Sequence, residues 1–181
     1  MSSTNHISYF FAEYPDFNYD PTETAHSEFR RLCRSMGWER DDPEKVEAYA
    51  DFQDAIVMQF NERFGTDADK LEPWQKLCRR LGIEPVPDNL KEAREAVFNT
   101  HVNLVDLTEA NSNSQHKLVI FDTERELARY SKRTGRYMPS ESPLVGGVLR
   151  ALLRFLFNPP KEDLKRDQFG RYVRRGGKTE E

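Results

Sequence analysis

The pattern of hydrophobic and polar positions contains one short apolar motif twice, at an offset of 45 residues. In segments 29–37 and 74–82, four apolar residues recur at i, i+3, i+4 and i+7, which places them on one face of a helix. A glycine follows each motif, where its left-handed backbone conformation ends a helix. The matched pairs are Phe29 and Trp74, Leu32 and Leu77, Cys33 and Cys78, Met36 and Leu81, and Gly37 and Gly82. We therefore expect an internal repeat.

A second, longer apolar stripe follows each motif. Asp42 and Pro43 have the residue types of an N-cap and a first helical position, and Pro87-Asp88 begins the corresponding helix of the second copy. The first stripe consists of Val46, Tyr49, Phe52, Ile56, Phe60 and Phe64, and the second of Leu90, Ala93, Val97, His101, Leu104 and Thr108. The expected helices are 24–36, 43–64, 69–81 and 88–108. Two stacked hairpins of this kind would bury their stripes against each other.

The following segment predicts a short β element and two further helices. Polar residues 111–116 indicate a loop, and 118–121 has the composition of a strand. Because a strand needs a partner for its backbone groups, residues 102–107 could pair with it, in which case the fourth helix ends near Thr100. We then expect a helix that is capped by Asp122, runs to Thr134 and stops at Gly135, and a core helix over 143–157.

The two ends of the chain differ from this pattern. Residues 1–22 form an aromatic arm without extended helical spacing, which either packs on the core or docks on a partner. Residues 159–181 are charged and contain few apolar side chains, so we expect disorder there. The candidate docking aromatics of the arm are Tyr9, Phe10, Phe11, Tyr14 and Phe17.

These patterns together predict a mainly α fold. It comprises two related helical hairpins, a short β element and two further helices on the same core. The expected organisation is the arm over 1–22, the duplicated hairpins over 23–110, the strand and two helices over 111–158, and the tail over 159–181. A chain of 181 residues is long enough to bury a core of this kind.

The composition points to an intracellular protein, in the cytoplasm or the nucleus. The first residues lack a secretory signal, and the longest apolar stretch, 144–157, is too short to cross a bilayer and contains two arginines. We therefore expect no membrane partner. The two cysteines have no CxxC spacing, which favours reduced, buried thiols over a zinc site.

The net charge of −4 conceals an uneven distribution of charge along the chain. Residues 1–116 contain 22 acidic and 12 basic residues, whereas residues 117–181 contain 9 and 15. Such a division suggests a charged partner, and it also allows homo-oligomers in which an acidic face meets a basic one. Arginines beside glycine and tyrosine are typical of flexible nucleic-acid contacts. The candidate basic surface comprises Arg125, Arg129, Lys132, Arg133 and Arg136, which fall on one helical stripe, and Arg171, Arg174 and Arg175 of the tail.

The sequence contains no motif of a known catalytic or cofactor-binding type. Phosphate loops, the nucleophile elbow and HExxH are absent, and the four histidines are scattered. His101, on the apolar face of the fourth expected helix, is better explained as a buried, hydrogen-bonded histidine than as a catalytic base. We therefore expect no catalytic residues, cofactor or metal.

A set of short stretches between residues 9 and 156 forms a recognisable pattern. The stretches are 14–17, 28–29, 37–38, 41–42, 60–61, 64–66, 81–87, 100–107, Tyr130, 134–135, Pro139, 146–147 and 149–150. Together they resemble a group of small, mainly helical fungal proteins, and the resemblance excludes the tail. It implies a fungal source and a self-contained fold, and it implies no activity and no site residues.

Two functions remain as expectations from the sequence. The first is a protein–protein interaction or adaptor module without catalytic activity, suggested by the hairpins, the aromatic arm and the divided charge. The alternative is binding of RNA or DNA through the basic C-terminal half and tail. An enzyme with a site assembled across the repeats is a third, weaker interpretation.

Overall fold

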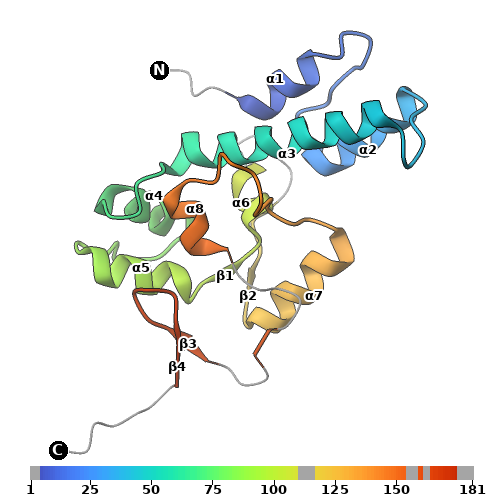
Figure 1. The fold of residues 1–181 in the computed structure, drawn as a ribbon. Coiled ribbons are helices and arrows are strands. Elements are labelled where there is room, and N and C mark those ends of the chain that lie inside the picture. Colours follow the sequence, from blue (N-terminus) through green and yellow to red (C-terminus); the bar gives the residue numbers. More distant parts are fainter. Residues whose placement is uncertain (1–4, 110–116, 154–158, 161–163, 175–181) are drawn as a thin grey trace, which may run out of the picture. The chain divides into compact units, whose positions relative to one another are not determined.

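The computed structural model describes residues 5–109, 117–153, 159–160 and 164–174 (Figure 1). Within these residues the chain forms eight helices and two small antiparallel strand pairs, which confirms the mainly helical prediction. The chain is divided between two compact units. Unit 1 takes residues 1–63, 103–119 and 136–145, and unit 2 takes residues 64–102, 120–135 and 146–181.

Unit 1 is built mainly from α1 (His6–Ala12), α2 (Ala25–Ser35), all but the last residue of α3 (Pro43–Phe64), and α6 (Leu104–Glu109). The Thr24 hydroxyl accepts a hydrogen bond from the Ser27 amide at 3.2 Å and thereby caps the start of α2. Beyond α2, Gly37 has a φ of 69°, as the sequence predicted for a helix stop. The predicted limits of α2 and α3 are thus confirmed to within one residue.

Phe52 of α3 lies at the centre of the aromatic core of unit 1. Its ring centroid lies 4.7 Å from that of Phe29 and 5.5 Å from that of Phe10, and Phe11 and His26 also contact it. Burying rings of this size stabilises a fold strongly, and edge-to-face or offset contacts add to the gain from area alone. The core of this unit therefore joins α1 and α2 to the middle of α3.

Unit 2 begins with α4 (Leu71–Leu81) and α5 (Leu90–Phe98) and continues with α7 (Glu124–Thr134) and α8 (Gly147–Leu152). Trp74 of α4 is fully buried, lies edge-to-face with Phe98 of α5 at 5.3 Å, and donates its indole N–H to the Ala68 carbonyl at 2.8 Å. This ring ties together α4, α5 and the loop before them. Gly82 ends α4 with a φ of 71°.

Two strand pairs complete unit 2. β1 (His101–Val102) pairs with β2 (Ile120–Phe121), so that His101 lies opposite Phe121. β3 (Lys165–Arg166) pairs with β4 (Tyr172–Val173) in a hairpin. Of the predicted strand 118–121, only Ile120–Phe121 form β2, and its partner is the short β1.

The fourth expected helix, 88–108, is wrong as one continuous element. α5 stops at Phe98 because polar side chains occupy its last carbonyls: the Asn99 amide donates to Glu95 O at 2.7 Å and Thr100 Oγ1 to Ala96 O at 2.9 Å. After β1, the Asn103 side chain caps α6 by accepting from the Val105 amide at 3.0 Å. The alternative that ends the helix near Thr100 is closer to the structure, although 104–109 is helical.

Other expected elements also differ from the structure. The aromatic arm contains α1, a short helix that buries Ile7, Phe10 and Phe11. The N-cap of α7 is Thr123, whose hydroxyl accepts from the Glu126 amide, and not Asp122 as expected. Of the helix expected over 143–157, only α8 is helical among the described residues, and 154–158 lie outside them.

The tail expected to be disordered over 159–181 instead contains the β3–β4 hairpin within its described residues, while 161–163 and 175–181 lie outside them. Both motif segments of the predicted repeat are helices that end at a left-handed glycine, yet α3 has 22 residues and α5 only 9. The 45-residue repeat therefore remains a prediction.

Candidate functional site

An exposed surface of unit 1 combines two aromatic rings with four carboxylates. We call it the acidic aromatic surface and define it as Glu13, Tyr14, Trp38, Glu44, Glu47 and Asp51. Tyr14 and Trp38 are only partly buried and pack on the aromatic core from outside. Their ring centroids lie 5.9 Å apart in an edge-to-face arrangement, with 79° between the ring planes.

Local structure brings these residues together from three segments. Glu13 is the C-cap of α1, and the Tyr14 amide donates to Phe11 O at 3.1 Å, so that the chain turns tightly after the helix. Trp38 directly follows the left-handed Gly37 and donates its indole N–H to the Glu44 carboxylate at 3.0 Å. Glu47 and Asp51 are one turn apart on the exposed first half of α3.

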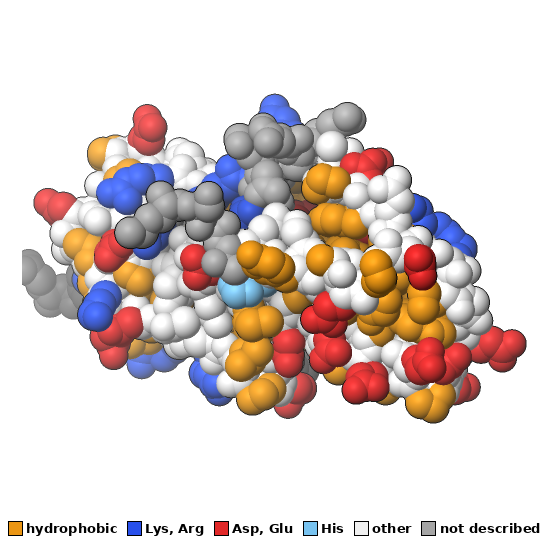
Figure 2. All heavy atoms as spheres, turned by 90° about the horizontal axis from the view of Figure 1, so that it is seen from above, with side chains coloured by type: hydrophobic (Ala, Val, Ile, Leu, Met, Phe, Trp, Pro, Cys, Tyr) orange, Lys and Arg blue, Asp and Glu red, His pale blue; other side chains and the backbone are white. Residues whose placement is uncertain are grey.

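The negative charge of this surface affects the pKa of Tyr14. Burial raises the pKa of the Tyr14 hydroxyl above its ordinary value, and the negative charges of Glu13, Asp51 and Glu47 raise it further. These carboxylates are therefore close enough to the ring for their charge to act on it. Figure 2 shows acidic side chains gathered around hydrophobic side chains on the right-hand part of the face it presents.

The two units differ in net charge, as the two parts of the sequence do. Unit 1 contains 16 acidic and 8 basic residues, a net charge of −8, and unit 2 contains 15 and 19, a net charge of +4. The acidic aromatic surface thus belongs to the strongly acidic unit. A cation that approaches it meets both an attractive field and partly exposed aromatic rings.

The structure places the five predicted docking aromatics in two different environments. Phe10, Phe11 and Phe17 are buried in the core of unit 1, so they are not part of its surface. Tyr9 is 65% exposed on α1, and Tyr14 belongs to the acidic aromatic surface. Trp38 was not among the predicted site residues, although a tryptophan directly after a helix-ending glycine was visible in the sequence.

The predicted basic surface is only partly brought together. Arg125, Arg129, Lys132 and Arg133 are exposed on α7 of unit 2. Arg136 lies beyond the end of α7, in unit 1, where it forms an ion pair with Asp106 and is largely buried. Its expected membership of the stripe is therefore wrong. Arg171 and Arg174 are exposed beside β4, and Arg175 lies outside the described residues.

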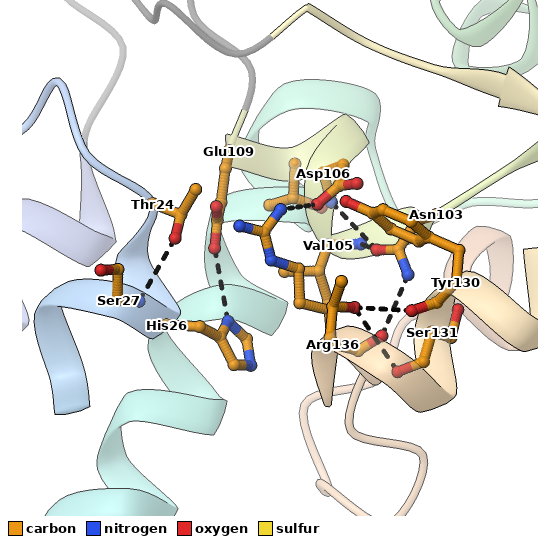
Figure 3. A network of polar contacts seen from close by, with 12 residues as sticks. Thr24, His26, Ser27, Asn103, Val105, Asp106, Glu109, Tyr130, Ser131 and Arg136 are labelled. Carbon is orange, nitrogen blue, oxygen red and sulfur yellow. Dashed lines mark hydrogen bonds and ion pairs between the residues drawn. The ribbon is translucent and has the colours of Figure 1, made fainter.

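A second cluster of polar residues in unit 1 is mostly buried. Figure 3 shows the His26 ring and the Glu109 carboxylate pointing toward each other, with 3.5 Å between His26 Nδ1 and Glu109 Oε1. Beside them, Arg136 points toward Asp106, and the Asn103 side-chain amide donates to Arg136 O at 3.0 Å. These contacts hold α6 against α2 and against the segment after α7. We interpret the cluster as structural, because the Arg136 guanidinium pairs with Asp106 and the Glu109 carboxylate faces the His26 ring.

The other residues with catalytic or metal-binding side chains do not form a common site. His101 is buried in β1, and both cysteines are buried thiols. Within the described part of the chain, no group of three or more histidine, cysteine, aspartate or glutamate residues could hold a metal ion. In the same part, no helix is both long and apolar enough to span a membrane.

Comparison with known proteins found no match to a family model, to a curated protein or to a solved structure.

Proposed function

We propose that this protein is an interaction module that binds a basic segment of a partner protein at the acidic aromatic surface. One observation carries the proposal: the partly exposed pair Tyr14 and Trp38 is held edge-to-face within a group of carboxylates. A lysine or arginine side chain of the partner would lie against the rings and pair with Glu47 or Asp51. The segment would also bring apolar side chains to cover the exposed rings.

The magnitudes favour recognition of several basic residues over a single one. A cation against an exposed ring contributes about 0.5–1 kcal/mol, and an exposed ion pair contributes roughly 0.2–1 kcal/mol. One such contact gives no useful affinity, whereas three or four along a segment, with burial of apolar area, reach about micromolar dissociation constants. The net charge of −8 on unit 1 would also increase the rate of association at low salt.

The arrangement of the site supports a protein ligand more than a small one. The four carboxylates come from the C-cap of α1 and from α3, Trp38 comes from the loop after α2, and all four carboxylates are exposed. Open surfaces with aromatic residues at the centre and charged residues at the edge are typical of protein interfaces. This assignment develops the adaptor function expected from the sequence.

Selection from a random peptide library displayed on phage tests the proposal directly. We expect peptides selected on the wild-type protein to be enriched in lysine and arginine with flanking apolar residues. A synthetic peptide of the consensus should then bind more weakly to a Glu47→Gln/Asp51→Asn variant, by about tenfold, because two charges are lost at constant side-chain size. Its affinity should also fall as salt rises.

The matched control is Glu62→Gln, which removes an exposed carboxylate at the far end of the same helix. Because Glu62 lies outside the acidic aromatic surface, we expect this variant to bind the peptide as the wild type does. Selected peptides without basic residues, or equal loss of affinity in the control, would refute the assignment.

A further inference from the structure

The β3–β4 hairpin of unit 2 is anchored by polar contacts that the composition of the tail does not suggest. Asn99 at the end of α5 exchanges two hydrogen bonds with the backbone of Arg166, each 2.9 Å long. The Arg166 guanidinium forms an ion pair with Glu124 of α7 at 3.0 Å, and the Tyr172 hydroxyl donates to the same carboxylate at 2.8 Å. The hairpin is therefore fixed to α5 and α7.

Burial strengthens this anchor. The Glu124 side chain is 7% exposed and that of Arg166 is 12% exposed, so their ion pair is little screened by water. The turn between the strands also packs closely: a Cβ added at Gly170, which has a φ of 75°, would lie 3.6 Å from the Phe98 ring. The inner face of the hairpin thus has a defined position on unit 2.

The opposite face of the hairpin carries cations and exposed apolar side chains. Lys165 pairs with Val173 in the strand register, and both are exposed, on the face opposite Arg166 and Tyr172. In the turn, Phe169 is 63% exposed, and the Arg171 guanidinium lies over its ring at 4.8 Å. Asp167 holds this guanidinium through an ion pair of 2.7 Å. The ion pair between Asp167 and Arg171 thus fixes the turn, in which the Phe169 ring is exposed to solvent.

The helix α7, whose buried Glu124 anchors the hairpin, carries cations on its exposed side. Glu124, which binds the hairpin, is followed directly by Arg125, and Arg129, Lys132 and Arg133 then share the exposed side of the helix. At 1.5 Å per residue, the four cations extend over about 12 Å. Arg133 also lies over the Tyr130 ring at 5.8 Å. The four cations of α7 and the exposed Phe169 ring therefore belong to the same unit.

We propose that the outer face of the β3–β4 hairpin and the basic face of α7 form a binding site for single-stranded nucleic acid. Phosphates would contact Arg129 and Lys132, and one base would stack on Phe169 beside Arg171. A single strand fits because its bases are free to stack on an aromatic ring, whereas those of a duplex are already stacked. This site lies in unit 2 and is independent of the acidic aromatic surface of unit 1.

The chemistry of the site distinguishes a nucleic acid from other anionic partners. An anionic membrane would gain from the cations and from any apolar residue, so it would not need an aromatic ring at position 169. Stacking of a base does need the ring, whether it is phenylalanine or tyrosine. The dependence on the ring is therefore the property to measure.

Fluorescence anisotropy of the full chain with fluorescein-labelled 12-nucleotide oligo(dT) and oligo(U) tests the site. We expect Phe169→Ala to weaken binding between about 5- and 150-fold, the range produced by loss of one base–aromatic stack, and Phe169→Tyr to restore it. Arg129→Ala/Lys132→Ala should weaken binding about tenfold and reduce the slope of log affinity against log salt by about 1.4, because two phosphate contacts are lost.

The matched control is Arg79→Ala/Lys91→Ala, which removes one exposed arginine and one exposed lysine from α4 and α5 of the same unit. It should leave affinity and salt slope unchanged, and circular dichroism should show every variant folded. No binding at 20 mM salt, or equal losses in the control, would overturn the proposal. So would equal binding of Phe169→Ala and wild type, or tighter binding to vesicles with 30% phosphatidylserine that does not need the ring.

Discussion

Replacement of Glu28 by glutamine tests how a buried carboxylate fixes the chain ahead of α2. The Glu28 side chain is 2% exposed and accepts three hydrogen bonds: from the Asp20 amide at 2.8 Å, and from Arg31 Nε at 2.9 Å and Nη2 at 2.5 Å. The same arginine donates to the Asn18 carbonyl and lies over the Phe17 ring at 4.3 Å. The carboxylate therefore orders residues 17–20 against α2.

The expected loss follows from these contacts. Glutamine keeps one acceptor oxygen, but its NH₂ group would face the donors of Arg31, so at least one charge-assisted hydrogen bond is lost. Such a bond contributes about 1.5–3 kcal/mol. Because the Arg31 side chain is 40% exposed and water can solvate it after the substitution, the cost stays below the 3–5 kcal/mol of a fully buried pair. We expect Glu28→Gln to lower the free energy of unfolding by about 2 kcal/mol at pH 7.

The effect should also depend on pH in a defined direction. Burial alone would raise the pKa of Glu28, but the hydrogen bonds from Arg31 and the Asp20 amide outweigh it and lower the pKa below its ordinary value. The carboxylate therefore stabilises the fold fully above its unfolded pKa of about 4.3, and this stabilisation is lost as pH falls through the lower folded pKa. The difference between wild type and variant should be constant from pH 6 to 7 and decrease below about pH 4.

Urea unfolding followed by tryptophan fluorescence measures this difference. Trp38 lies in unit 1 and Trp74 in unit 2, so a Trp74→Phe background in both proteins makes the emission report on unit 1. Glu23→Gln, an exposed substitution just before α2, is the control and should change stability by less than about 0.5 kcal/mol. A loss for Glu28→Gln within that range, or one that does not decrease at low pH, would show that this network does not stabilise the fold.

Two further predictions concern thiols and glycines. Burial raises the pKa of the Cys33 and Cys78 thiols, so both should react with Ellman's reagent at pH 8 far more slowly in the native protein than in urea; fast native reaction would contradict their burial. Gly82→Ala should cost about 1 kcal/mol in urea unfolding, since its left-handed backbone is the only obstacle to a Cβ. Gly147→Ala should cost more, because the new Cβ would lie 3.0 Å from the Thr66 carbonyl oxygen, and equal losses would show that this contact relaxes.

The sequence predicts the elements whose signals are local. Periodic apolar residues and a following glycine place α2 and α4 within two residues of their observed limits, and Gly135 ends α7 as expected. The helix α1 has only 7 residues, about two turns, so its periodicity is too short to distinguish from an irregular aromatic segment. The end of α5 depends on side-chain hydrogen bonds of Asn99 and Thr100, which hydrophobic periodicity does not report.

The candidate sites were harder to predict than the helices, because they depend more on tertiary contacts. Val46 and Tyr49 have the spacing of core residues but are 61% and 42% exposed, so a place on the apolar stripe does not by itself decide burial. The hairpin of the tail depends on Glu124 and Asn99, which are 42 and 67 residues away from Arg166. Contacts at such separations leave no periodic signal in the sequence, whereas the four cations on α7 were predicted from local spacing.

Because the chain passes repeatedly between the two units, few positions are suitable for truncation or cleavage. The boundary between the units is crossed after residues 63, 102, 119, 135 and 145, so neither unit is one continuous stretch of sequence. A fragment that ends at residue 102 would contain most of unit 1 but would lack α6 and its ion pair with Arg136. Gene fusions and truncations therefore belong at the two chain ends, and a protease nick between the units would separate residues that fold together.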